Sequence, residues 1–274
     1  MKNAKAFTYN GKKSDTDFGL KIVMNESDFT KNLGLAREIV KGETTKFRNT
    51  PNHLGAKYSD VLSFQIFVMK DICKVNQSDM KWSREDIRKI TAWLSSSKTP
   101  KILSFDYTNN EEENYDYYGL FTDFTTYTFG HEVYGITLQF TCTNQYAYTK
   151  EQSYICNGDC KIIINNTSDE WEEYIYPKIE IIPSITETIT IANETDGKSF
   201  TAKIKKGNSV YIDCANNIVT DDSGIVTLDS LGISIQDLDK LYWFRLLNGE
   251  NRVSVSGNSS VVFKCRYPRK VGEI

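Results

Sequence analysis

Histidine, the commonest catalytic base, is scarce in this chain. Its 274 residues include two histidines, His53 and His131. A Ser-His-Asp or Cys-His arrangement needs a histidine beside a nucleophile. Neither histidine lies in a recognisable nucleophile signature, and His53 falls in the turn-like run 50–55. The sequence therefore predicts no nucleophilic catalysis by either residue.

The cysteines are the next candidates for chemistry. Cys156 and Cys160, with Cys142 and His131 upstream, could in principle hold a tetrahedral zinc ion. The chain has no CxxC pair, however, and the alternating pattern around Cys142 explains it as a buried core residue. We therefore predict no metal. Because no secretory signal is present, we also expect reduced thiols at all six positions: Cys73, Cys142, Cys156, Cys160, Cys214 and Cys265.

Three consecutive glutamates, Glu111, Glu112 and Glu113, could suggest a hydrolase. The paired carboxylates of a glycosidase, however, come from separate elements on two sides of a cleft. Three neighbouring glutamates are better explained as a solvated hairpin tip. The chain also has no Gly-rich phosphate loop and no HExxH motif. We predict that the protein is not an enzyme and needs no cofactor.

The aromatic residues suggest a different activity, the binding of sugar rings. Trp171, Trp243 and the many tyrosines could stack on sugar rings, although burial in a β-sandwich core is the more common fate of such aromatic residues. We keep Trp171 as a candidate for sugar stacking.

The bulk composition indicates a globular chain of one large domain or two ordinary ones. Hydrophobic residues make up 39% and aromatic residues 12%, which is enough to build cores. The net charge of −3 favours neither nucleic acid nor an anionic membrane as a partner. No run approaches the ~20 apolar residues of a membrane span, and the N-terminus lacks the apolar run of a secretory signal. We expect synthesis in a cytoplasm and no membrane insertion.

Most of the chain alternates between apolar and polar residues with a period of two, as half-buried strands do. The clearest examples are the runs 62–68 and 136–142. Asn10-Gly11 predicts a tight hairpin. The pattern changes near residue 148, where we place a domain boundary. Beyond it we predict a β-sandwich or jelly roll, with hairpins at Gly207-Asn208 and at Gly257-Asn258.

One segment predicts a helix. Ser83 can cap its first turn, and Asp86 lies near the positive end of the helix dipole. Ile87, Ile90 and Leu94 then form an apolar stripe. Serines at 95–97 and Pro100 end the helix. The predicted fold class is therefore mainly β, with one amphipathic helix.

Several segments, in this order, resemble the distal tail proteins (Dit family) of long, non-contractile-tailed bacteriophages of Gram-positive hosts. The segments are 7–11, 17–20, 87–94, 103–106, 117–119, 136–142, 244–251 and 266–270. Together they span nearly the whole chain. Asn248 departs from the family pattern, in which proline is expected, and residues 167–232 match no part of it.

The resemblance implies a ring-forming N-terminal β domain over residues 1–147 and a galectin-like β-sandwich over 148–274. Whether the last residues pack back on the first domain is left open. The family assembles as a homohexamer, in one ring or two, that joins the tail tube to the tail tip or baseplate. Phage DNA passes through its centre without specific binding. The resemblance thus implies a structural protein of the virion.

The ring contacts are predicted from the irregular, polar segments beside strong strands. These contain Phe47, Arg48 and the glutamates at 111–113. The alternative function is a carbohydrate-binding adhesion module, in which the second domain recognises host wall sugars through Trp171. A wall-degrading enzyme is a third reading, for which the sequence supplies no residues.

Overall fold

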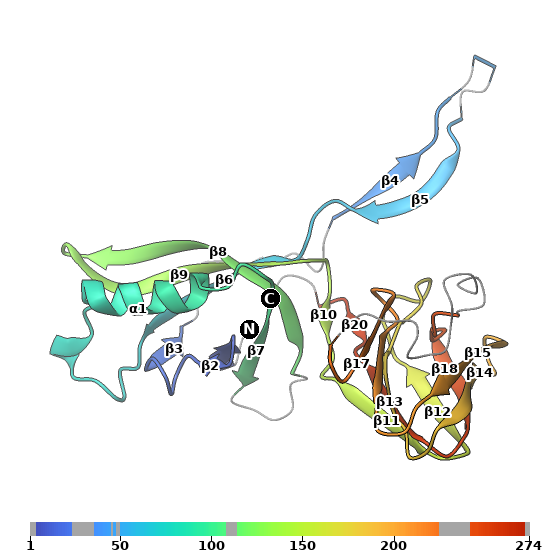
Figure 1. Cartoon of the computed structure of the whole chain (residues 1–274). Coiled ribbons are helices and arrows are strands. Elements are labelled where there is room, and N and C mark those ends of the chain that lie inside the picture. The colour runs from blue at the N-terminus through green and yellow to red at the C-terminus, as the bar shows by residue number, and fades with distance from the viewer. Residues whose placement is uncertain are drawn as a thin grey trace. The chain divides into compact units, whose positions relative to one another are not determined.

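The computed structural model describes residues 4–23, 36–44, 46–47, 50–107, 114–224 and 242–271 (Figure 1). The chain divides into two compact units. Unit 1 comprises Met1–Tyr148 with Lys270–Ile274, and unit 2 comprises Thr149–Arg269. Strands account for slightly more than half of the described residues in each unit, as the fold class predicted.

Unit 1 contains the following elements: β1 (Ala4–Tyr9), β2 (Lys12–Lys13), β3 (Leu20–Ile22), β4 (Arg37–Lys41), β5 (His53–Tyr58), β6 (Ser63–Lys70), the 3₁₀ turn η1 (Gln77–Asp79), α1 (Arg84–Ser95), β7 (Lys101–Tyr107), β8 (Asp116–Phe129), β9 (Glu132–Cys142) and β10 (Ala147–Tyr148). Unit 2 contains β11 (Gln152–Asn157), β12 (Cys160–Asn166), β13 (Lys178–Ile182), β14 (Glu187–Asn193), β15 (Lys198–Ile204), β16 (Val210–Asp213), β17 (Ile218–Asp221), β18 (Gly249–Ser256), β19 (Ser260–Cys265) and β20 (Pro268–Arg269).

The main sheet of unit 1 runs β2-β1-β7-β8-β9-β6-β3, with antiparallel neighbours throughout. Its first hairpin turns at Asn10-Gly11, where both residues have positive φ (48° and 75°), as predicted. The two alternating runs become neighbouring strands, because Phe64 pairs with Phe140 and Ile66 faces Leu138. The side chains of these four residues are buried together.

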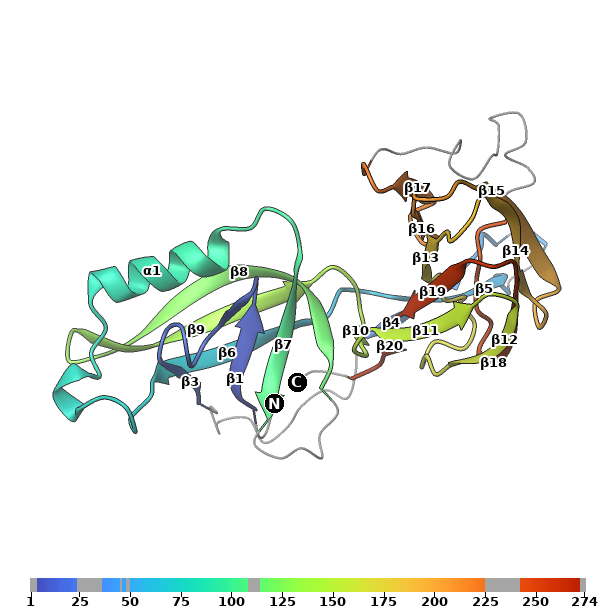
Figure 2. The same cartoon turned by 60° about the horizontal axis from the view of Figure 1, so that its bottom comes forward.

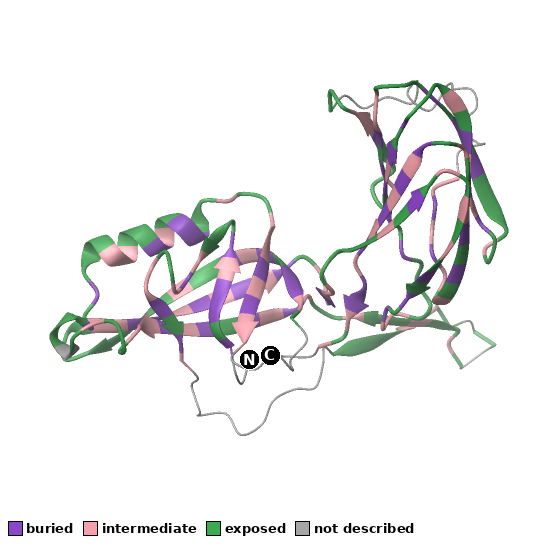
Figure 3. Ribbon diagram, turned by 90° about the horizontal axis from the view of Figure 1, so that it is seen from below, coloured by how far each residue is buried: buried purple, intermediate pink, exposed green. Residues whose placement is uncertain are grey.

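Aromatic rings fill the core between this sheet and α1, which lies beside β8 and β9 (Figure 2). Trp93 of α1 stacks on Phe7 of β1, with ring centroids 5.6 Å apart. Its Nε1–H also donates a hydrogen bond to the backbone oxygen of Tyr9 (3.1 Å). Ile90, Trp93 and Leu94 are buried, whereas the opposite side of the helix is exposed (Figure 3). The apolar stripe thus fixes which face of α1 covers the sheet.

The start of α1 is stabilised by a capping box. The Ser83 hydroxyl accepts a hydrogen bond from the Asp86 amide (3.1 Å), and the Asp86 carboxylate accepts one from the Ser83 amide (3.0 Å). We expect Ser83→Ala to destabilise unit 1 by about 1 kcal/mol, because the first turn loses a backbone partner. Thermal unfolding monitored by circular dichroism measures this loss.

The matched control for Ser83→Ala is Ser95→Ala at the other end of the helix. The Ser95 hydroxyl bonds the Thr91 carbonyl one turn back (2.6 Å), an interaction that contributes little to helix stability. Equal effects of the two substitutions would contradict a specific capping role for Ser83.

Unit 2 is a β-sandwich of two antiparallel sheets, ordered β11-β19-β13-β16-β17 and β12-β18-β14-β15. Their inner faces share one apolar core, in which the rings of Phe244 and Phe263 lie 5.4 Å apart. Inward residues alternate with outward ones along the strands, for example in β15 and β19. The sandwich predicted for the second half is therefore confirmed.

The two hairpins predicted within this half are wrong. Gly207-Asn208 connects β15 to β16, and Gly257-Asn258 connects β18 to β19, and in each case the two strands belong to different sheets. The turn residues correctly mark a reversal of the chain. They cannot show whether the next strand pairs with the previous one or crosses to the opposite sheet, because that choice depends on long-range packing.

Candidate functional site

An arm, the β4–β5 hairpin, stands away from the main sheet of unit 1 (Figure 1). Its two strands pair with each other as a separate two-stranded sheet, with Glu38 opposite Lys57 and Ile39 opposite Ala56. At its base, both the amide and the hydroxyl of Ser59 donate to the backbone oxygen of Ala36 (3.0 and 2.7 Å). The two ends of the arm therefore lie side by side at its base.

The arm exposes several large apolar side chains to solvent. Ile39 and Leu54 are exposed on its strands, and Phe47 beyond them is 95% exposed. A two-stranded hairpin is at best marginally stable in water, and its outer edges can pair with another chain. These properties make the arm a candidate surface for contact with a partner.

Phe47, predicted as an interface residue, thus lies on the arm and is accessible, while its contact with a neighbour stays a prediction. Arg48 lies outside the described residues. The sequence reading identified only an irregular segment here and missed strands β4 and β5. The available signal was the β-branched run Ile39-Val40 between charged residues. His53, expected in a turn, instead opens β5.

The outer part of the β8–β9 hairpin forms a second accessible surface. From Thr125 to the Gly130-His131 turn the side chains are exposed, including Tyr127 and Phe129, the latter 73% exposed. Sequence analysis missed this surface, although the alternation of threonine with aromatic residues was visible there. The predicted contact residues Glu111, Glu112 and Glu113 lie outside the described residues. The segment that contains them joins the antiparallel neighbours β7 and β8.

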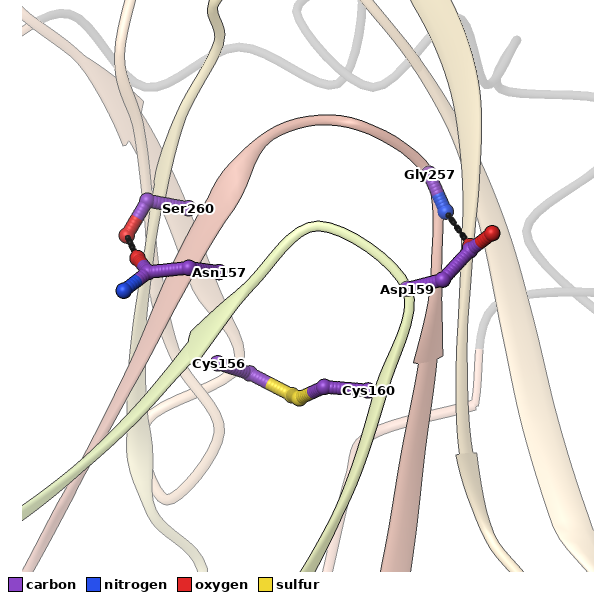
Figure 4. Close-up of a disulfide and its surroundings, with 6 residues drawn as sticks. All are labelled: Cys156, Asn157, Asp159, Cys160, Gly257 and Ser260. Carbon is purple, nitrogen blue, oxygen red and sulfur yellow. Dashed lines mark hydrogen bonds between the residues drawn. A yellow bond between two sulfur atoms is a disulfide. The ribbon is translucent and has the colours of Figure 1, made fainter.

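The expectation of reduced cysteines is wrong for one pair. Cys156 at the end of β11 and Cys160 at the start of β12 form a disulfide, with Cα atoms 5.9 Å apart (Figure 4). The reason is geometric, since the turn between the two strands brings the side chains within disulfide reach. The bond links the two sheets of the sandwich. Beside it, Gly257 donates its amide to Asp159 (2.7 Å), and the Ser260 hydroxyl donates to Asn157 (2.8 Å).

The four residues considered for zinc are not brought together. Cys156 and Cys160 are bonded to each other, and His131 precedes the first residue of β9 while Cys142 is its last, which places them roughly 35 Å apart at strand geometry. Burial raises the pKa of the Cys142 thiol to about 12, which keeps it protonated, as the core reading implied. Within the described ranges, no group of three or more His, Cys, Asp or Glu side chains could hold a metal. None of the helices described there is long and apolar enough to cross a membrane.

Unit 2 carries a polar cluster centred on Asp196, whose side chain is only 7% exposed. Arg245 donates two hydrogen bonds to the Asp196 carboxylate, from Nε (2.9 Å) and Nη2 (3.0 Å), and the Tyr242 hydroxyl donates a third (2.5 Å). The guanidinium also lies over the Tyr174 ring, 3.9 Å from its centroid. Trp171, upstream of Tyr174, is 78% exposed and accessible to a ligand, so sugar stacking by Trp171 stays a prediction.

Removal of the Arg245 charge is expected to leave Asp196 buried without its cation. The Arg245 hydrogen bonds hold the pKa of Asp196 below its usual value near 3.8. The stabilisation is therefore complete above pH 3.8 and declines as the pH falls below it. We expect Arg245→Met to lower the stability of unit 2 by about 2 kcal/mol at pH 7. Urea titrations at pH 7 and pH 2.5 measure whether the difference between variant and parent shrinks in acid, and an unchanged difference would contradict the ion pair as its cause.

Comparison with known proteins gives the following similarities. Residues 2–144 match the family described as Phage tail protein N-terminal domain, and residues 146–265 match the one described as Phage tail C-terminal domain. No match was found among curated protein sequences.

Solved structures share the fold at low identity. The Dit protein of SPP1 aligns with a TM-score of 0.59 and 16% identity, over 96% of this chain and 98% of that chain. A chain of the phage P2 baseplate in its activated conformation with Ca aligns with a TM-score of 0.58 and 10% identity, over 97% and 98%. The phage p2 baseplate with Sr gives 0.56 and 11%, over 98% and 99%.

Proposed function

Because the chain belongs to the phage tail protein family, we propose that it builds the distal hub ring of a phage tail. In this role it is a structural component of the virion. The ring joins the tail tube on one side to the tail-tip or baseplate proteins on the other. Phage DNA crosses its centre, and the chain catalyses no reaction.

The observation that carries this proposal is the arm. A projecting hairpin with exposed Ile39, Leu54 and Phe47 is suited to reach a neighbouring copy. In a closed ring every subunit gives one surface and receives another, so each arm has one acceptor. Six copies follow from the family resemblance. The SPP1 Dit protein is described as a paradigm of the hub adsorption apparatus in phages that infect Gram-positive hosts, and the likeness of its fold supports the same role.

The charge of the chain is compatible with a DNA conduit. Lysines and arginines number 33 against 36 aspartates and glutamates, so the protein as a whole does not attract phosphates. The contacts of Glu111, Glu112 and Glu113 with a neighbour remain part of the proposal. The C-terminal sandwich, which we propose to be galectin-like, would face outward from the ring.

Native mass tests the proposal. We expect light scattering to give a mass near six times, or twelve times, the 31.4 kDa of one chain. Electron microscopy of the same sample should show rings with a central opening. A monomer at every concentration, both alone and mixed with the tail tube protein of the same phage, would overturn the ring.

A further inference from the structure

Unit 2 contains an open hollow of about 500 Å³ that the hub role does not use. This volume lies within the range of about 300–1,000 Å³ that is usual for small-molecule sites. It is lined by Tyr176, Cys214, Ala215, Asn217, Tyr242, Trp243 and Arg245. Trp171 does not line it.

The backbone explains why these side chains meet. Ile175 and Leu246 exchange two backbone hydrogen bonds (3.0 and 2.8 Å), and both of their side chains are buried. Along an extended chain neighbouring side chains point to opposite sides, so Tyr176 and Arg245 project from the other face of this bridge. The Cys214 amide donates to the Pro177 carbonyl (3.3 Å) and holds a third segment against them.

The aromatic walls are firmly held yet accessible. Tyr242 and Trp243 are partly buried and pack against the sandwich core, whereas Tyr176 is exposed. Asn217, the polar residue on the third segment, adopts a positive φ of 58°. The hollow thus combines rigid rings with an exposed side-chain amide.

The charge in the hollow is already compensated. Arg245 donates two hydrogen bonds to the Asp196 carboxylate (2.9 and 3.0 Å), so its positive charge is paired with a negative one. Among the described residues, its Nη1 group has no hydrogen-bond acceptor, so this group can donate to a ligand. Exposed Glu172 and Glu173 add negative charge to the segment that leads to Tyr176. The electrostatic attraction of an anionic ligand such as a phosphate would therefore be weak here. The binding of a neutral ligand with hydroxyl groups does not depend on this attraction.

We propose that this hollow binds a neutral pyranose sugar. The rings of Tyr176, Tyr242 and Trp243 would contact its apolar C–H faces. The Asn217 amide and the free N–H groups of Arg245 would bond its hydroxyls, with Asp196 and Tyr174 holding the guanidinium in place. The site does not depend on ring assembly, because all of its residues belong to unit 2 of one chain.

The test is saturation-transfer NMR on the full-length protein. The probes are glucose, galactose, rhamnose and N-acetylglucosamine, with glycerol 3-phosphate as the anionic probe. We expect transfer to the ring protons of at least one neutral sugar and none to glycerol 3-phosphate. Tyr176→Ala should weaken binding about tenfold, which corresponds to the loss of one aromatic contact. Asn217→Gly should weaken it too, since glycine keeps the positive φ and removes only the amide.

Tyr211→Ala is the matched control, because Tyr211 is a similarly exposed tyrosine on β16 that does not line the hollow. Its binding should equal that of the parent. No transfer to any neutral sugar, transfer that survives both Tyr176→Ala and Asn217→Gly, or preferential binding of glycerol 3-phosphate would each overturn the proposal. Circular dichroism of every variant separates loss of the site from loss of folding. The oligomeric mass reports on the hub role separately.

Discussion

Excision of the arm is expected to reduce the native protein from the proposed ring to single chains, each slightly lighter than the 31.4 kDa of the parent chain. The variant removes residues 37–58 and joins Ala36 to Ser59 through an Asn-Gly turn. The join should not strain unit 1, because Ala36 and Ser59 are already hydrogen-bonded at the base of the arm. Each protomer then loses the exposed apolar surface proposed to reach its neighbour.

Light scattering of parent and variant at equal concentration measures this effect. A milder variant, Ile39→Thr with Phe47→Ser and Leu54→Thr, keeps the hairpin and should weaken the assembly without abolishing it. Trp171→Ala is the control, since it removes a highly exposed aromatic residue from unit 2 and should leave the mass unchanged. A ring of normal mass without the arm would show that subunits meet through another surface.

Substitution of Gly119 by alanine is expected to have the largest effect on stability in unit 1. Gly119 pairs with Cys142 across β8 and β9. An added Cβ would lie 2.2 Å from the backbone oxygen of Thr141 and 2.8 Å from the Cα of Cys142. Backbone atoms of a paired strand cannot move aside as a side chain can. The hydrogen-bonded pairing of β8 with β9 must therefore be disrupted around Gly119. We expect a loss of about 3 kcal/mol or more, seen as a lower urea midpoint of unit 1.

Gly42→Ala provides the comparison for Gly119→Ala. An added Cβ there would meet the Asn52 Cβ at 3.3 Å, which a small shift can relieve. The substitution should change the urea midpoint little. If Gly119→Ala were as well tolerated as Gly42→Ala, the close approach of β8 to β9 would be wrong.

Local patterns predicted the elements of this protein well. Asn10-Gly11 gives the expected hairpin, and Ser83 with Asp86 gives the capping box, because each depends on residues close in sequence. The alternating runs of β6 and β9 predicted buried faces correctly. Nothing local identified these strands as partners, since their pairing joins residues such as Ser63 and Thr141 across the unit.

The surfaces were harder to predict than the elements. The hollow of unit 2 collects Tyr176, Cys214 and Trp243 from three separate segments, and no spacing in the sequence relates them. Of the two tryptophans considered for sugar stacking, Trp243 lines that hollow, whereas Trp171, the one chosen as the candidate, does not. The arm escaped notice because no residue of its two strands is buried, so the strands lack the regular apolar-polar alternation that marks strands packed in a core.

The arm also affects whether subunits that have not yet assembled aggregate in solution. Charged residues, Arg37, Glu38, Lys41 and Lys57, flank the apolar side chains of its strands, and three of these four residues are positive. In dilute buffer these charges discourage arms from associating at random. Salt at 1 M shortens the Debye length to about 3 Å and removes that protection. Unassembled subunits should consequently remain soluble longer at low ionic strength. In concentrated salt, we expect them to aggregate before they unfold.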